Sequence, residues 1–103
     1  MDIHLAGSRA TRRAPKEYFT GTVWQDPIIV AEPPARIASN RVAFEPGART
    51  NWHTHPLGQT LYVIAGVGRV QTKGGPILEI RPAMWCGFRL AKSIGMAPRR
   101  PMA

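Results

Sequence analysis

Short runs in which apolar side chains alternate with polar ones are the main pattern along this chain. Residues 41–44 alternate in this way, with Val42 and Phe44 as the large apolar side chains. Apolar side chains dominate residues 59–65, and residues 67–72 beyond Gly66 have Val67 and Val70 among polar residues. A period of two is typical of β-strands, because successive side chains of a strand face opposite sides of the sheet. No long stretch has apolar residues at helical spacing. The pattern therefore predicts an all-β fold.

Turn residues divide these runs. Ten Gly and ten Pro make up about a fifth of the 103 residues, which favours short strands joined by turns. We expect a strand break at Asp26-Pro27, a hairpin around Gly66, and a positive φ in at least one of Gly66, Gly74 and Gly75. The expected strands are 18–23, 28–30, 41–44, 51–55, 59–65, 67–72 and 77–80, and the expected turns are 45–47 and 73–76.

The length of the chain fits one domain with one hydrophobic core. Residues 1–17 are polar and basic and are expected to form an arm or an edge element. After Pro82 the composition changes, because residues 83–103 contain no Asp or Glu, three of the four Met, and no period of two. We therefore expect a domain over residues 1–82, followed by a disordered or loosely packed tail over residues 83–103.

The net charge of +8 raises the question of a nucleic-acid partner. Residues 1–80 hold nine basic and six acidic residues, a net of +3, whereas residues 81–103 hold five basic residues and no acid. The excess lies among Pro, Ala and Met in the tail and not on a stripe with interleaved aromatic residues, which nucleic-acid binding favours. We expect no nucleic-acid partner.

The single cysteine, Cys86, excludes an internal disulfide and fits a reducing compartment. The first residues lack the apolar region of a signal peptide, and no apolar run is long enough to span a membrane. We expect a cytoplasmic protein without a membrane partner.

His53 and His55 stand two residues apart in a predicted strand, so both imidazoles would project to one face and reach one ion. Gln59 opens the next predicted strand, and its side-chain oxygen would supply a third ligand. A lone histidine on a sheet serves packing more often than coordination, and Gln59 can instead hydrogen-bond a strand end. A His-x-His pair with a polar third partner is a better metal signal than a lone histidine. The residues alone leave both interpretations open.

The spacing around the two histidines resembles the first conserved motif of the cupins over residues 47–66. The residues at the motif spacings are Gly47, His53, His55, Gln59 and Gly66. Most cupins have Glu where this chain has Gln59. In this respect the chain is similar to the small manganese cupins of the bacterial hydroxynitrile lyase type, which are related to the carboxymuconolactone decarboxylase-associated cupins. Residues 19–27 and 44–50 resemble the same group.

This resemblance, which covers about residues 1–82, implies a small antiparallel jelly-roll β-barrel. It implies that His53, His55 and Gln59 bind a divalent metal ion. Manganese is the first candidate for this ion, and iron, nickel or zinc are the alternatives. It also implies a small-molecule substrate, a lyase reaction and a homodimer. Because the amide of Gln59 is neutral, the ion would keep nearly its full charge and act as a stronger Lewis acid. No residue can be assigned as general acid or base, so the catalytic residues stay unknown.

The second cupin motif, Gly-x5-Pro-x-Gly-x2-His, supplies the last metal-binding histidine and is missing after Pro82. If the reading frame is moved one base earlier, each new codon takes the last base of one codon and the first two bases of the next. The codons of residues 84–86 then encode two Val whichever synonymous codons are used. The neighbouring codons permit Gly-Asp before these two Val, and Trp, an apolar residue and Pro-Pro-Gly-Glu-Lys-His after them. This completes the motif without a gap, with the histidine encoded across Ser93 and Ile94.

We therefore expect a frameshifted tail, a barrel incomplete at its C-terminal end, and a site impaired by loss of this ligand. The alternative is a divergent C-terminus that is rich in Arg and Pro.

Two other interpretations of the function stay open. A non-catalytic cupin that binds or senses a ligand would carry the same motif, and turnover would separate it from an enzyme. A chain without the last ligand and the final strands can also be a nonfunctional product, because exposed sheet edges invite aggregation and a weakened metal site lowers stability.

Overall fold

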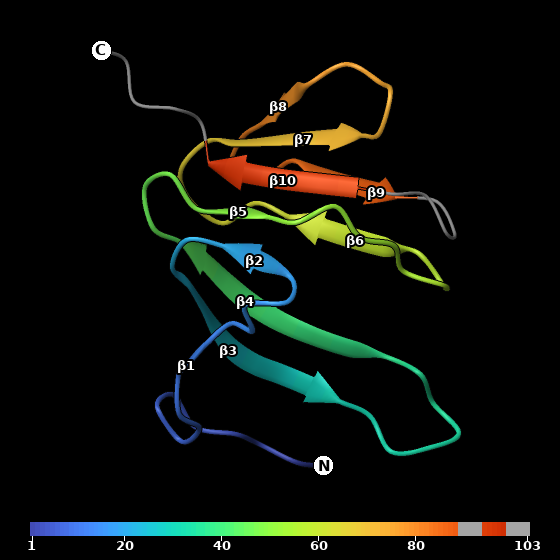
Figure 1. Ribbon diagram of the computed structural model, residues 1–103. Coiled ribbons are helices and arrows are strands. Elements are labelled where there is room, and N and C mark those ends of the chain that lie inside the picture. The colour runs from blue at the N-terminus through green and yellow to red at the C-terminus, as the bar shows by residue number, and fades with distance from the viewer. Residues whose placement is uncertain (89–93, 99–103) are drawn as a thin grey trace.

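The computed structural model describes residues 1–88 and 94–98, which form antiparallel strands (Figure 1). The predicted all-β fold is confirmed, since these residues contain no helix. It follows that no helix of the described residues is long and apolar enough to cross a membrane. The strands are β1 (Arg12–Arg13), β2 (Phe19–Thr20), β3 (Val23–Val30), β4 (Ala38–Phe44), β5 (Arg49–Thr50), β6 (Gln59–Tyr62), β7 (Gly68–Thr72), β8 (Leu78–Ile80), β9 (Trp85–Phe88) and β10 (Ile94–Pro98).

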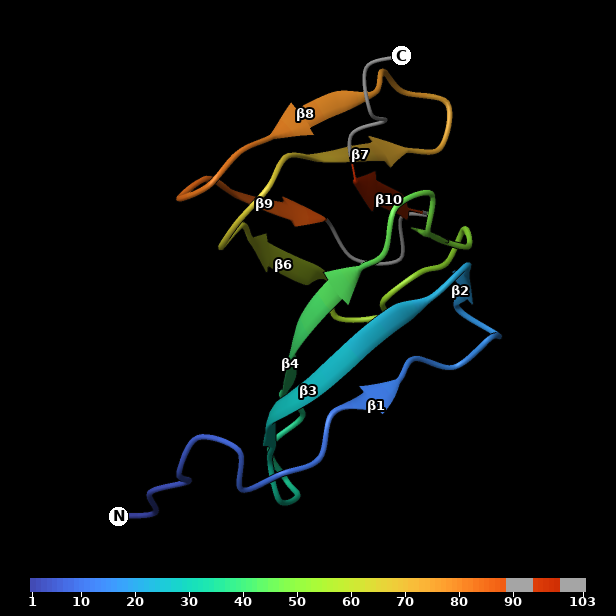
Figure 2. The same ribbon diagram turned by 90° about the vertical axis from the view of Figure 1, so that its left-hand side faces the viewer.

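The strands pair in four small sheets. β1, β3 and β4 form one sheet and β10, β7 and β8 a second, while β2 pairs with β5 and β6 with β9. Figures 1 and 2 place the long β3–β4 ribbon at one end of the molecule, the β7–β8–β10 sheet at the other, and the β6–β9 pair between them. Across the described residues these sheets do not close into a barrel, so the predicted jelly roll is present in open form.

The main buried cluster lies where β3 begins and the chain enters β5. Ala14, Val23 and Ala48 are buried, and Phe19 and Phe44 pack against them. The two phenyl rings meet edge to face with their centroids 6.0 Å apart, and aromatic pairs favour this arrangement. This cluster fixes the start of the segment that leads to the two histidines.

The expected turns are confirmed by backbone conformation. Gly47, Gly66 and Gly74 have φ values of 82°, 75° and 83°, a region that favours glycine because it has no Cβ. Residues 73–76 join β7 to β8 as an antiparallel hairpin.

The expected break at Asp26-Pro27 is wrong, because β3 continues through both residues. Pro27 pairs with Asn40 of β4, and the register shifts between Pro27 and Ile29. Proline lacks an N–H donor and is tolerated in a strand at a free edge or a bulge. Since β1 pairs only with Trp24 and Gln25 of β3, the other edge of the strand has no β1 partner at Pro27.

The expected hairpin between residues 59–65 and 67–72 is also wrong. β6 pairs with β9, whereas β7 pairs with β8 and β10, so the bend at Gly66 carries the chain from one sheet into another. An alternating pattern shows which face of a strand is buried but does not identify the neighbouring strand.

The expectation that the tail after Pro82 does not continue the sheet is wrong for the residues that the structure describes there. β9 pairs with β6 over four residues, and β10 pairs with β7 over five. Strand pairing rests on backbone hydrogen bonds, and aromatic side chains such as Trp85 and Phe88 suit strands. Residues 89–93 and 99–103 lie outside the described part of the chain, and so does the remainder of this expectation.

Candidate metal centre

His53 lies just beyond β5 and is oriented by a backbone carbonyl. Its side chain is half-buried, and its Nδ1 is 2.7 Å from the carbonyl oxygen of Asn51. A carbonyl only accepts hydrogen bonds, so Nδ1 carries the proton and the lone pair is on Nε2. Backbone contacts of this kind fix the tautomer and the ring orientation of metal-binding histidines. His53 therefore presents Nε2 as its free ligating atom.

Asn51 is in turn held against the segment around β2. Its backbone N–H donates to the carbonyl of Tyr18 at 2.7 Å, and its Nδ2 donates to the carbonyl of Glu17 at 3.0 Å. Thr20 Oγ1 donates to its Oδ1 at 2.6 Å. These three bonds fix the residue whose carbonyl orients His53. The sequence gives no signal for this role, because the partners of Asn51 lie about thirty residues away along the chain.

His55 places a second imidazole beside the first. The ring centroids of His53 and His55 are 4.9 Å apart, and the rings meet edge to face at 80°. Nε2 of His55 is buried and has no hydrogen-bond partner within the described part of the chain. Burial, and secondly the charge of His53, lowers the pKa of His55 below its ordinary value of 6.5. The ring is therefore neutral at pH 7 and can ligate without first losing a proton.

Gln59 follows a tight turn and opens β6. The N–H of Gly58 donates to the carbonyl of His55 at 3.0 Å, and Gly58 has a φ of 82°. Gln59 pairs with Phe88 of β9, and its Oε1 is buried without a hydrogen-bond partner among the described residues. Leaving such an atom unsatisfied costs about 1–3 kcal/mol, so a ligand for this oxygen is expected.

The structure brings the two histidines together, although not on the expected strand over residues 51–55. β5 ends at Thr50, and His53 forms only an isolated bridge, so that strand prediction is wrong. The described residues contain no cluster of three or more His, Cys, Asp or Glu side chains that could hold a metal ion. A site with three protein ligands therefore needs a donor of another kind, such as the amide oxygen of Gln59.

These donors fit a divalent first-row metal. Imidazole nitrogens suit zinc, iron and nickel, and an oxygen ligand also suits manganese. The buried His55 Nε2 and Gln59 Oε1 support this fit, because neither has a hydrogen-bond partner among the described residues and a bound metal ion would give each of them a partner. The codons that would encode the last histidine belong to Ser93, outside the described residues, and to Ile94, whose backbone begins β10 opposite Thr72.

The fold has a solved counterpart. The crystal structure of a cupin-like protein from Thermotoga maritima matches with a TM-score of 0.78 and 31% sequence identity, over 95% of this chain and 71% of that chain. The chain belongs to the cupin superfamily. This cupin is also 55% identical to a protein named (R)-mandelonitrile lyase from Granulicella tundricola over 82 residues, which are 80% of this chain.

The cupin covers 63% of that lyase, less than two thirds of its length. No family model matches the sequence. The predicted membership of the cupins and the predicted similarity to hydroxynitrile lyases are confirmed by these comparisons.

Proposed function

We propose that this cupin is a metal-dependent lyase of the hydroxynitrile lyase type. His53, His55 and Gln59 would bind one divalent ion, for which manganese is the first candidate. The observation that carries the proposal is the buried Nε2 of His55, which has no hydrogen-bond partner among the described residues and belongs to a ring beside the imidazole of His53. The Oε1 of Gln59 is also buried without such a partner. The similarity to (R)-mandelonitrile lyase supports the reaction class. In such a reaction the bond between the carbinol carbon and the nitrile carbon breaks, cyanide leaves with the electron pair, and the hydroxyl group loses its proton.

The three side chains have different roles in this proposal. When bound, the ion would supply a Lewis-acid centre for a substrate oxygen or for cyanide. Gln59 ligates without cancelling charge, which keeps the site attractive to anions. His53 keeps its ring fixed through the carbonyl of Asn51, and His55 offers a nitrogen that is already deprotonated at pH 7.

The site is expected to hold manganese weakly. Manganese is low in the affinity order of divalent metals, and two imidazoles with one amide leave several coordination positions to water. A further histidine would strengthen the site, so the proposed enzyme is impaired in its present form.

Bound metal is the direct test of the site. We expect equilibrium dialysis against manganese to show binding to the protein, and about tenfold weaker binding to His55→Ala and to Gln59→Ala, because each loses a ligand. His4→Ala is the matched control, since His4 lies in the exposed N-terminal segment. Cleavage of mandelonitrile, followed by the absorbance of benzaldehyde, tests the reaction. Equal metal content in His55→Ala and His4→Ala would contradict the proposed ligand set.

A non-catalytic cupin that binds a ligand is the second candidate. The open arrangement of the described sheets favours it, because lyase chemistry on charged species gains from a site that excludes water. Metal-loaded protein that binds benzaldehyde without cleaving mandelonitrile would support this alternative.

We also propose a homodimer through the β3–β4 ribbon. Apolar side chains at its outer end are between 47% and 79% exposed, namely Ile28, Ile29, Val30 and Ile37. Exposed apolar patches of this kind mark interfaces, and this patch can pack against the same patch of a second copy about a twofold axis. Light scattering coupled to gel filtration measures the dimer, and Ile29→Lys should shift it to monomer.

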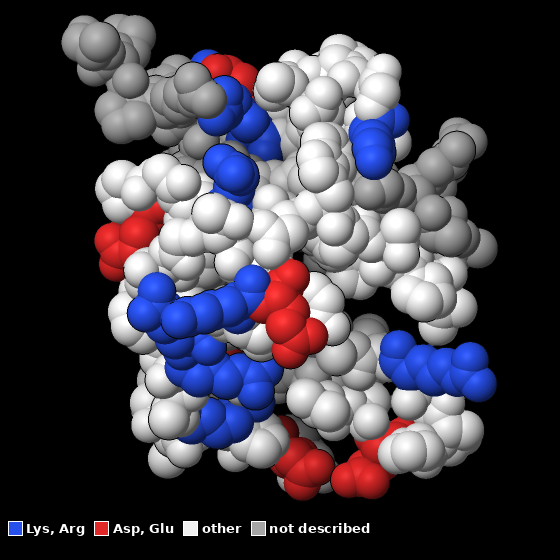
Figure 3. Space-filling view, in the orientation of Figure 1, with Lys and Arg blue, Asp and Glu red and all other residues white. Residues whose placement is uncertain are grey.

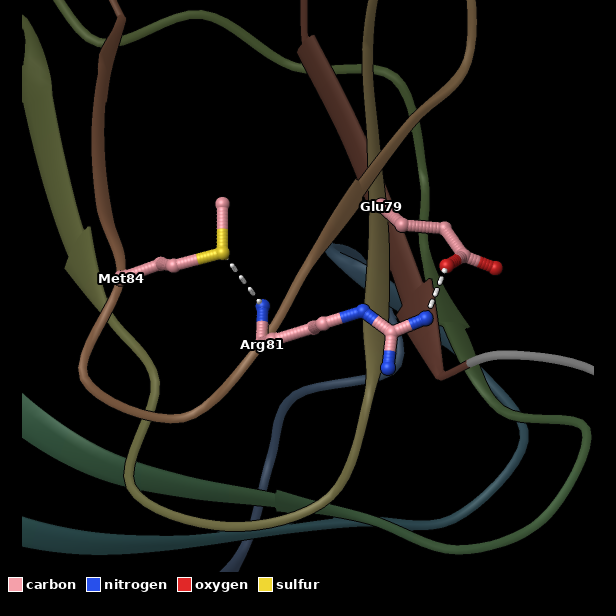
Figure 4. Close-up of polar contacts among 3 residues, drawn as sticks. All are labelled: Glu79, Arg81 and Met84. Atoms are coloured by element: carbon pink, nitrogen blue, oxygen red, sulfur yellow. Dashed lines mark hydrogen bonds and ion pairs between the residues drawn. The ribbon is translucent and has the colours of Figure 1, made fainter.

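A strained turn supports the proposal that residues after Pro82 are read in a shifted frame. Met84 N–H donates to the carbonyl of Arg81 at 2.9 Å across Pro82 and Ala83 (Figure 4 shows Arg81 and Met84). Ala83 has a φ of 68° and is the one residue other than glycine with a positive φ among the described residues. A turn of this kind, with Pro at its second position, favours Gly at its third position. The shifted frame permits Gly at this position.

A further inference from the structure

A groove separate from the two histidines lies between β5 and β7, with β10 along it. Its volume is about 410 Å³, and neither His53, His55 nor Gln59 lines it. β10 pairs with β7 on one side, and on the other the N–H of Met96 donates to Thr50 Oγ1 of β5 at 2.9 Å. The paired strands β7 and β10 therefore line the groove together with β5 and the residues that follow it.

Two guanidinium groups and no carboxylate line this groove. Arg49 comes from β5 and Arg69 from β7. Arg69 is half-buried, and its Nε is buried without a hydrogen-bond partner in the described part of the molecule. A guanidinium stays protonated, and its planar set of N–H donors matches the two oxygens of a carboxylate.

The acid opposite Arg69 in the strand register does not neutralise it. Glu79 of β8 is paired with Arg69, but its carboxylate accepts a hydrogen bond from Arg81 at 3.1 Å (Figure 4). Of the residues described, Glu79 and Arg81 form the single ion pair, so neither Arg49 nor Arg69 has an acidic partner. The protein as a whole carries a net charge of +8, and basic side chains also gather over β1 and β2 (Figure 3). An anion in the groove would relieve this excess of positive charge.

Two large apolar side chains also line the groove, beside the polar Thr50, Asn51 and Gln71. Trp52 lies directly over Gly95 of β10, since a Cβ added to Gly95 would stand 3.4 Å from Cζ3 of the indole ring. Trp52 is 48% exposed and Ile77 58% exposed, and both line the groove. Aromatic surfaces of this kind bind flat apolar groups.

We propose that this groove binds a small aromatic carboxylate. The carboxylate accepts hydrogen bonds from Arg69 and Arg49, and the ring of the ligand packs against Trp52. None of the three proposed metal ligands lines the groove, although Asn51, whose carbonyl orients His53, does. Failure of this proposal and failure of the proposed lyase function are therefore separated by measuring benzoate binding with and without metal.

The test is calorimetric titration of the full chain with benzoate, with benzamide as its neutral isostere and with inorganic phosphate, at constant ionic strength. Benzoate is expected to bind at least about tenfold more tightly than benzamide, because only the carboxylate pairs with the guanidinium groups. Phosphate lacks the ring and is expected to bind more weakly than benzoate. Equal affinity for benzoate and benzamide, or tighter binding of phosphate, overturns the assignment.

Charge-matched variants locate the site. Arg69→Gln is expected to weaken benzoate binding about tenfold or more, and Arg41→Gln, which removes the same charge from exposed β4, less than about twofold. Arg69→Lys keeps the charge without the planar donor set and should lie between the two, which guards against a fold defect in Arg69→Gln. Equal effects of Arg69→Gln and Arg41→Gln would show that net charge alone attracts benzoate. The titration is repeated after treatment with a chelator, because loss of metal should not change benzoate affinity.

Discussion

Asn51 fixes the carbonyl that orients His53, and its amide bonds to the backbone of Glu17 and to Thr20. Asn51→Ala removes both side-chain bonds and keeps the carbonyl. Each such bond contributes about 0.5–1.5 kcal/mol, so we expect the free energy of unfolding to fall by about 1–3 kcal/mol. Bound manganese should fall with it, because His53 loses its fixed orientation. Thr20→Val removes one of the bonds and should lose about half as much stability in urea unfolding. An unchanged stability of Asn51→Ala would contradict this role.

His55 makes the stability of the metal-free protein depend on pH. Burial lowers the pKa of the folded protein's His55 below 6.5, the value expected for the unfolded chain. Above pH 6.5 the ring is neutral in both states. Below it, the unfolded chain binds a proton that the folded chain does not, so acid favours unfolding.

We therefore expect the melting temperature of metal-free protein to fall between about pH 7.5 and pH 5.5, and His55→Asn to reduce this dependence. The measurement is thermal unfolding followed by circular dichroism in a chelator. A melting temperature that rises on acidification would be evidence against a depressed pKa at His55.

At the scale of elements, the turn between β8 and β9 carries the clearest strain. A left-handed conformation costs a residue with a Cβ about 1–2 kcal/mol, and Ala83 has a φ of 68°. Ala83→Gly should therefore raise the free energy of unfolding by about 1 kcal/mol, less the entropy that glycine adds to the unfolded chain. The control Ala38→Gly lies in extended β4 and should destabilise by about 0.5–1 kcal/mol. Destabilisation by both changes would mean that Ala83 is not strained.

The sequence predictions are correct where a feature depends on local interactions and wrong where it depends on contacts between segments far apart in the sequence. Turns at Gly47 and Gly74 were predictable, because a positive φ is a local property of glycine. Pairing of β6 with β9 was not, because alternation contains no information about the partner strand. Pro27 is tolerated in β3 because β1 ends before it reaches Pro27, so no pairing with β1 requires an N–H donor there, and this depends on tertiary structure.

The candidate site shows the same division. The motif spacing predicted His53, His55 and Gln59 as ligands, and the structure brings the two imidazoles together. The strand that was to align them ends at Thr50, and the orientation comes from a carbonyl on a loop. Such a contact depends on how Asn51 is anchored to a distant segment, which no local pattern encodes.

At the scale of the whole molecule, the open sheets are related to how β9 and β10 are paired and exposed. β9 and β10 pair with β6 and β7, yet Trp85 is 68% exposed and the described sheets do not close. One face of β9 is half-buried through Cys86 and Phe88, and no side chain of β9 is fully buried. The strand therefore gains less stability than one with a buried face, because most of the stabilisation of a sheet comes from the side chains it buries.

The last prediction is that restoring the other reading frame from position 83 onward recovers both metal and stability. The restored sequence begins Gly-Asp-Val-Val-Trp, which places Gly at the strained position 83 and two β-branched residues in β9. It also places a histidine at position 94, where β10 begins opposite β7. A third imidazole adds a strong ligand, so bound manganese should rise at least about tenfold and the melting temperature should increase, since metal binding contributes to folding energy. The control carries the restored segment with Ala in place of the new histidine, and should gain stability without gaining metal. Equal metal content in the present chain and the restored one, measured side by side, would refute the shifted frame as the cause of the weak site.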